Sequence, residues 1–168
     1  MTNKSITIEN ARIGFRNFSG KEKQYNPLGK RNFCIFLDPD LGKILQNDGW
    51  NVRWTPARDK NEEELGYLQV AINYENIPPK IVLISSKGKT LLNEDTISDL
   101  DTAEFSNIDI IIRPYNWVLQ EGTKNEKRGV KAYVKSMYLT LYEDELENKY
   151  FKVPTKNINE DQNVDNPF

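Results

Sequence analysis

The stretch FSNIDIIIRPYNWVLQEGTKNEKRGVKAYVKSMYLTLY, residues 105–142, decides the fold of this chain. Its two halves, Phe105–Val118 and Gly129–Tyr142, are rich in β-branched and aromatic residues, the composition of long strands. Residues 120–129 between them are rich in Gly, Lys, Glu and Asn, which is typical of a hairpin loop. The stretch therefore predicts one long β-hairpin.

Aromatic and basic residues alternate along both predicted strands, so they share one face of the hairpin. A loop centred on Lys124 predicts these facing pairs: Trp117 with Lys131, Tyr115 with Tyr133, and Arg113 with Lys135. Three further bases lie at or beside the loop: Lys124, Lys127 and Arg128. Farther along, Met137, Leu139 and Leu141 continue the Lys131 face. Either this second half packs in the core, or a β-bulge near Ser136 moves these residues to the other face.

Such a face has two interpretations. Aromatic planes stack on unpaired bases while cations hold phosphates, which would make the face a binding surface for a single strand. Alternatively, the rings belong to the core and the cations extend from its rim to solvent. The residue pattern alone leaves both open.

The rest of the chain predicts short strands with one or two helices. Expected strands are Ile6–Phe15, Arg31–Asp38, Trp50–Trp54, Tyr67–Tyr74 and Lys80–Ser85. Asp38-Pro39 predicts a helix start and Asp48-Gly49 its end, with further short helices at Glu94–Leu100 and Glu143–Tyr150. Trp50 and Trp54 are expected in the core. The fold class is mainly β, a small Greek-key barrel.

Composition excludes several classes of protein. The chain has 168 residues, no histidine and one cysteine, so it predicts no disulfide framework, no Ser-His or Cys-His catalysis and no histidine metal site. We expect no metal and no cofactor, and Cys34 lies in an apolar run as a core residue. Neither a signal peptide nor an apolar run long enough to cross a membrane is present, so a cytoplasmic protein is expected.

Charge is nearly balanced overall, with 23 Lys+Arg against 25 Asp+Glu, but it is unevenly placed. Residues 1–36 hold seven bases against two acids, and residues 113–135 hold six against two. Residues 93–109 carry six acids and no base. Two basic segments that face one way create a local positive field. This adds Arg16, Lys30 and Arg31 to the candidate binding residues.

The end of the chain has a different composition. Residues 154–168 are polar and acidic, so we predict a folded domain over 1–153 and a flexible tail over 154–168. The tail ends in Asp165-Asn166-Pro167-Phe168, where an aromatic ring and a terminal carboxylate together make an anchor for a partner. The alternative is an ordinary frayed terminus.

This tail resembles those of bacterial and bacteriophage single-stranded DNA-binding proteins, which end in a short aromatic tip after acidic residues. Asp165, Pro167 and Phe168 match that pattern, whereas Asn166 replaces the usual apolar residue and the acids are fewer, which leaves the docking partner open. The body is similar to phage-encoded OB-fold members in these strings: Arg31-Asn32-Phe33-Cys34, Gly49-Trp50-Asn51-Val52-Arg53, Arg113-Pro114-Tyr115-Asn116-Trp117 and Lys131-Ala132-Tyr133-Val134-Lys135.

The resemblance implies a five-stranded OB barrel that binds single-stranded DNA without sequence preference. It also implies a role in phage replication or recombination, with the tail recruiting replication or recombination proteins. A homodimer is one candidate assembly.

Two other functions compete with this expectation. The chain could be a protein-interaction or inhibitor module with its aromatics in the core. Alternating acids at Asp99, Asp101 and Asp109 could instead hold magnesium in a nuclease. Gly88-Lys89-Thr90 ends like a P-loop, but Leu83 occupies the position of the required first glycine.

Overall fold

A computed structural model describes residues 4–56, 64–75 and 77–143. Its elements, in chain order, are β1 (Ile6–Ile8), β2 (Arg12–Asn17), β3 (Arg31–Leu37), α1 (Pro39–Asn47), β4 (Val52–Thr55), β5 (Leu65–Ile72), β6 (Lys80–Ser85), β7 (Gly88–Leu92), the 3₁₀ helix η1 (Ile97–Asp101), β8 (Phe105–Leu119) and β9 (Lys127–Leu141).

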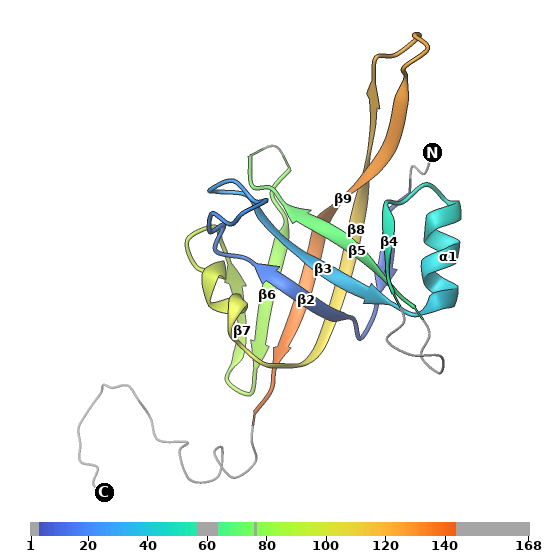
Figure 1. The fold of residues 1–168 in the computed structure, drawn as a ribbon. Helices are drawn as coiled ribbons and strands as arrows, with labels where there is room; N and C mark the ends of the chain where they lie inside the picture. The colour runs from blue at the N-terminus through green and yellow to red at the C-terminus, as the bar shows by residue number, and fades with distance from the viewer. Residues whose placement is uncertain (1–3, 57–63, 76, 144–168) are drawn as a thin grey trace, which may run out of the picture.

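The strands form one mixed sheet in the order β1-β8-β9-β5-β3-β2 (Figure 1). β1 pairs with β8 and β2 pairs with β3, so the segment 6–17 joins the two ends of the sheet. Ala11 lies between β1 and β2 and still donates its N–H to the Ile108 carbonyl, at 2.7 Å. β5 and β9 pair in parallel. This is the strand order of an OB-like Greek-key barrel, and the predicted fold class is confirmed.

Four elements are additions to the five-stranded plan: α1, β4, β6 and β7. α1 and β4 lie between β3 and β5 in the chain, and the β6–β7 hairpin lies between β5 and β8, with β6 parallel to β9. Asp38 caps α1 by accepting the Leu41 N–H at 2.9 Å, and Pro39 follows at the first turn, as predicted. Gly42 lets the helix approach the Trp54 ring, because a β-carbon there would lie 2.8 Å from Cη2.

The inward faces of the strands make the core. On β3, Phe33, Ile35 and Leu37 are fully buried, and the alternate residues Asn32, Cys34 and Phe36 lie on the outer face. Trp50 is 2% exposed, so its expected core position is confirmed, and Trp54 packs against the core from the side. Cys34 is buried as predicted, and burial raises the pKa of its thiol.

The predicted β8–β9 hairpin is present, but its register was wrong by two residues. Tyr115 faces Lys131, Arg113 faces Tyr133 and Trp117 faces Gly129. The cause is a shorter loop, Gln120–Glu126, in which the Gln120 carbonyl accepts the Thr123 hydroxyl and the Glu126 carboxylate accepts the Gly122 N–H. β9 therefore starts at Lys127. A shift of two residues keeps every side chain on its predicted face.

A β-bulge lies next to Ser136, which was one of the two alternatives that the sequence left open. The register of β8 and β9 shifts between Ile111 and Ile112, opposite Ser136 and Val134, and leaves Lys135 as the extra residue. Val130, Ala132 and Val134 point inward before the bulge, and Met137 and Leu139 point inward after it. Lys131 and Tyr133 consequently lie on the outer face while Met137 packs in the core.

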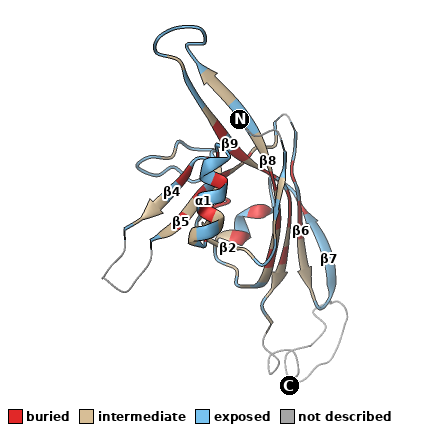
Figure 2. Cartoon of the chain, turned by 90° about the vertical axis from the view of Figure 1, so that its right-hand side faces the viewer, coloured by how far each residue is buried: buried red, intermediate tan, exposed pale blue. Residues whose placement is uncertain are grey.

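From Arg113 to Tyr133, β8 and β9 form a two-stranded arm, whose base still pairs with β5 at Ala132 and Tyr133 and whose tip projects from the body (Figure 1). Figure 2 shows both strands changing from buried to intermediate and exposed along this arm. The arm is the structural basis of the site described below.

Several expected boundaries change. The first predicted strand is two strands, β1 and β2, and β7 was not predicted. The expected helix Glu94–Leu100 is the 3₁₀ helix Ile97–Asp101, and Gly88-Lys89-Thr90 starts β7 after a tight turn. The expected closing helix 143–150 and tail 154–168 lie outside the described residues, apart from Glu143. Among the described residues, no helix has the length and apolar character needed to span a membrane.

Candidate nucleic-acid interface

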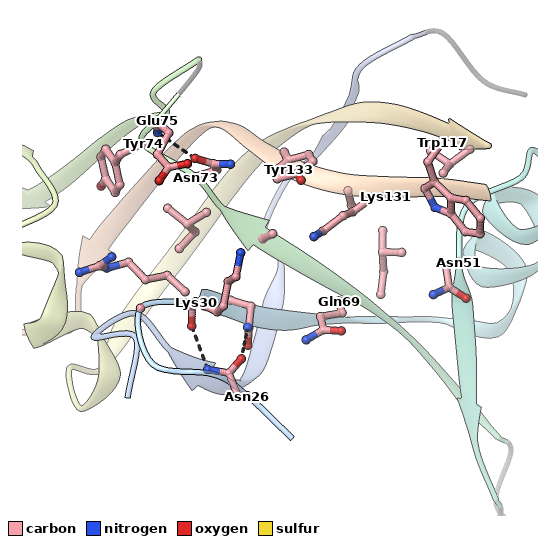
Figure 3. Close-up of a pocket in the computed structure, with 18 of the residues that line it drawn as sticks. Asn26, Lys30, Asn51, Gln69, Asn73, Tyr74, Glu75, Trp117, Lys131 and Tyr133 are labelled. Carbon is pink, nitrogen blue, oxygen red and sulfur yellow. Dashed lines mark hydrogen bonds between the residues drawn. The ribbon is translucent and has the colours of Figure 1, made fainter. Parts of the chain in front are cut away.

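A groove with a volume of about 420 Å³ lies between the arm and the β2–β3 loop, over the outer face of β3 and β5. Its lining includes three aromatic side chains, three cations and two carboxylates: Tyr74, Trp117, Tyr133, Lys30, Arg31, Lys131, Glu75 and Glu94. Figure 3 shows Trp117 near one end, Tyr74 near the other, and Lys131 and Tyr133 between them. The outer face of these strands is where OB-folds bind oligonucleotides.

The side of the groove formed by the arm, here the arm wall, has Tyr133 at its centre. Its ring has the Arg113 guanidinium 4.7 Å and the Lys131 ammonium 5.2 Å from its centroid. Tyr115 meets it edge to face at 6.2 Å and is 53% exposed. The wall therefore offers contiguous ring surface with positive charge beside it.

Trp117 lies across the backbone of the opposite strand. Its pairing partner is Gly129, and a β-carbon there would lie 2.6 Å from the indole Cε2. Real side chains do not approach this closely. The glycine is what allows the indole to lie on β9 beside the groove.

The β2–β3 loop, residues 18–30, forms the opposite wall and is held by Asn26. The Asn26 amide donates to the carbonyls of Lys21, Pro27 and Lys30, and its oxygen accepts from Asn32 at 2.7 Å. This network fixes the backbone at Lys30 on the groove (Figure 3). Beside it, Tyr25 is 91% exposed.

At the Tyr74 end of the groove, Arg31 forms an ion pair with Glu94, with 2.9 Å between Nη1 and Oε2. The Arg31 Nε and the Tyr74 hydroxyl are buried and have no hydrogen-bond partner among the described residues. Burial raises the pKa of Tyr74 to about 12, with the Glu94 charge adding to the increase and Arg31 opposing it. At this end of the groove, two hydrogen-bond donors without a partner among the described residues, Arg31 Nε and the Tyr74 hydroxyl, therefore lie near the Glu94 carboxylate.

The other predicted site residues lie elsewhere. Lys124, Lys127 and Arg128 are exposed at the arm's tip, where Arg128 pairs with Glu126 at 2.6 Å and lowers the pKa of that carboxyl. Lys135 is exposed at the bulge, away from its expected partner Arg113.

Arg16 does not reach the groove. Its guanidinium donates to the carbonyls of Leu100 and Ala103, at 3.0 and 2.5 Å, and lies 5.3 Å from the Phe105 ring centroid. These contacts tie β2 to the segment around η1.

Sequence reasoning missed part of the groove. Tyr74, Glu75 and Glu94 line it, and so do five uncharged polar residues: Asn26, Asn32, Asn51, Gln69 and Asn73. The sequence does indicate an outward position for Gln69, because it is the one polar residue in the apolar run Leu68–Ile72 and alternation places it on the outer face. Nothing in the local sequence indicates that Glu94 lines the groove, since its partner Arg31 is 63 residues away in the sequence.

Two of the three acidic candidates, Asp101 and Asp109, accept backbone hydrogen bonds. Asp101 accepts the N–H groups of Phe18 and Ser19, at 2.6 and 3.2 Å, and Asp109 accepts that of Asn10 at 2.9 Å. Within residues 4–56, 64–75 and 77–143, no group of three or more His, Cys, Asp or Glu side chains could hold a metal ion.

Comparison with solved structures finds single-stranded DNA-binding proteins of bacteriophage Enc34. The structure of that protein in complex with ssDNA matches with a TM-score of 0.53 and 11% identity, over 83% of this chain and 88% of the other. Its C-terminally truncated form matches with a TM-score of 0.51 and 13% identity, over 83% and 87%. At these identities the likeness concerns the fold. No curated protein matches the chain.

A family model gives the stronger result. The model of a phage ssDNA-binding domain matches residues 1–167, nearly the whole chain. Together with the OB-like barrel and its groove of rings and cations, this match shows that the chain belongs to the phage ssDNA-binding domain family.

Proposed function

We propose that this protein binds single-stranded DNA without sequence preference, with the strand lying in the groove between the arm and the β2–β3 loop. The observation that supports this most is the arm wall, where Tyr133, Tyr115 and Trp117 present ring surface next to Arg113 and Lys131. Every base has a π-face, so stacking tolerates any sequence and contributes about 1–3 kcal/mol per base.

The cations that line the groove have the charge needed to contact the phosphates of a bound strand. Lys30 and Lys131 line the groove from opposite walls, so a strand between them would be contacted from both sides. Each phosphate neutralised on a single strand adds about −0.7 to the slope of log affinity against log salt.

The test is a titration of the full-length protein with oligo(dT), oligo(dC) and a duplex of the same length, at two salt concentrations. We expect similar affinities for the two single strands, a weaker affinity for the duplex, and a marked loss of affinity at the higher salt. An absence of single-strand binding would favour a protein-interaction module instead, with the rings serving packing.

We also propose that residues 154–168 act as an acidic tail which recruits replication or recombination proteins through Asp165, Pro167 and Phe168. The support is the sequence: spaced acids followed by Pro167-Phe168, whose aromatic ring can serve as an anchor. A negatively charged tether also competes with DNA for the positive groove, more strongly at low salt.

Three proteins test the tail: full-length, lacking 154–168, and lacking only Phe168. Deleting the whole tail should raise DNA affinity modestly at low salt and abolish pull-down of replication proteins. Deleting Phe168 alone should abolish the pull-down and leave DNA affinity unchanged, because no charge is lost. Identical behaviour of all three proteins in both assays would contradict the proposal.

A further inference from the structure

Outside the groove, three aromatic side chains gather on the outer face of β2, β3 and β5: Phe15, Phe36 and Tyr67, here the Phe15 cluster. The Phe15 ring lies 6.0 Å from the Phe36 ring and 6.5 Å from the Tyr67 ring, centroid to centroid. Phe15 is 70% exposed. The groove's lining includes none of the three.

An unusual backbone turns Phe15 outward. Its φ is +48°, in the left-handed region that residues with a β-carbon seldom adopt, and the pairing of β2 with β3 shifts between Gly14 and Asn17. Ile13, two residues earlier, packs against the core, and regular alternation would send Phe15 to that same side. A strained backbone that exposes a large apolar ring points to a function for the ring.

Gly14 supports the same arrangement. A β-carbon at this position would lie 2.6 Å from Phe36 Cε2, so the missing side chain is what lets the Phe36 ring extend over β2 toward Phe15. The three rings therefore form one continuous aromatic surface on the solvent side of the sheet.

Two arginines flank this surface. The strand registers place Arg12 opposite Phe36, Phe36 opposite Tyr67, and Tyr67 opposite Arg53, so the four residues form one row across β2, β3, β5 and β4. Both arginines are exposed, and neither has an ion pair or side-chain hydrogen bond among the described residues. Rings bordered by free cations have the chemistry of a single-strand platform.

The cluster continues the groove. Gln69 lines the groove and Tyr67 precedes it by two residues on β5, so both point to the same face about 6.7 Å apart. Asn51 lines the groove, and Arg53 follows by two residues at the start of β4. A strand that leaves the groove past Gln69 and Asn51 therefore arrives at Tyr67 and Arg53.

We propose that the Phe15 cluster is a second stacking site for single-stranded DNA, which receives the bases that leave the groove, with Arg12 and Arg53 contacting their phosphates. This inference rests on the proposed function. DNA is favoured over a protein partner because the cluster is continuous with the groove and bordered by two cations, Arg12 and Arg53, that have no ion-pair partner in the described part of the chain.

The experiment compares oligo(dT) of increasing length, from about 4 to about 16 nucleotides, the range of site sizes of OB-folds. The variants are Phe15→Gly and Phe15→Tyr, with Leu91→Ala as a control, since Leu91 is 67% exposed on β7. Glycine accepts a positive φ without strain, so Phe15→Gly should keep the melting temperature of the wild type.

We expect the shortest oligonucleotides, which fill only the groove, to bind Phe15→Gly and wild type equally. Long oligonucleotides should bind Phe15→Gly about 5- to 150-fold more weakly, the equivalent of one stacked base. Phe15→Tyr should restore the affinity, because it restores the ring. Arg53→Ala should flatten the salt slope by about 0.7 for long oligonucleotides alone, whereas Lys89→Ala should not.

Equal affinities of Phe15→Gly and wild type at every length would overturn the second site while leaving the groove intact. A loss of the same size at all lengths would also overturn it, since Phe15 would then act through the fold or the groove. If wild type binds no length, the proposed function fails as well.

Discussion

Replacing Gly129 by alanine tests whether the Trp117 indole is a stacking surface. The added β-carbon would lie 2.6 Å from the indole Cε2 and 2.9 Å from Nε1, so the ring must leave its place on β9. If the ring stacks on a base, single-strand affinity should fall by about 1–3 kcal/mol, which is about 5- to 150-fold.

Stability should change little. Removing a glycine from the middle of a strand stabilises the folded state by roughly 0.5–1 kcal/mol. This gain offsets the lost contact of an indole that is only partly buried. A binding loss without unfolding therefore separates a ligand contact from a packing defect.

A double-mutant cycle with Trp117→Ala makes the test decisive. Trp117→Ala alone should weaken oligo(dT) binding by a similar amount. In the Trp117→Ala background, Gly129→Ala should have no further effect on binding, because no indole remains to be displaced. Affinity is measured by fluorescence anisotropy and stability by urea unfolding. The reasoning is refuted if Gly129→Ala moves the indole, seen as a changed tryptophan emission, yet binds DNA as wild type does.

Three further changes have defined outcomes. Lys131→Ala should weaken binding of every sequence alike and flatten the salt slope by about 0.7, measured by titration from low to moderate salt; an unchanged slope would mean no phosphate contact. Glu94→Gln should free Arg31 from its ion pair, raise affinity and steepen the slope by up to about 0.7, with Glu121→Gln at the arm's tip as the control. Tyr74, with a pKa raised to about 12 in the folded state, contributes stability that is present below pH 10 and lost between about pH 10 and 12. Tyr74→Phe should reduce that alkaline loss in unfolding titrations, and an identical pH profile would contradict the burial of its hydroxyl.

The hairpin shows why part of the site could be predicted from the sequence. Alternation fixes which side chains share a face, and an error of two residues in register preserves the face, so Lys131 and Tyr133 do share one face with Arg113, Tyr115 and Trp117 despite wrong partners. The apolar residues lie at even-numbered positions up to Val134 and at odd-numbered positions from Met137, and this change in alternation indicated the bulge. Periodicity carries this information because it is local.

The missed features depend on information that is not local. Nothing near Phe15 in the sequence signals a positive φ, and its alternation with Ile13 predicts an inward ring. The pair of Arg31 with Glu94 exists only once the barrel brings distant segments together. Arg16 was predicted from charge alone, and its position beside Leu100 and Ala103 depends on where η1 packs.

The central place of β9 has a consequence for synthesis of the protein. β9 pairs with β5, β6 and β8 and carries Lys131 and Tyr133, yet among the described residues it is the last strand in chain order. The antiparallel pair of β3 with β5 and the β6–β7 hairpin can form on the ribosome as they emerge, whereas the barrel cannot close before β9 is made. The groove lacks its arm wall until that moment. Completion of the fold and completion of the proposed binding groove therefore fall in the same step of synthesis.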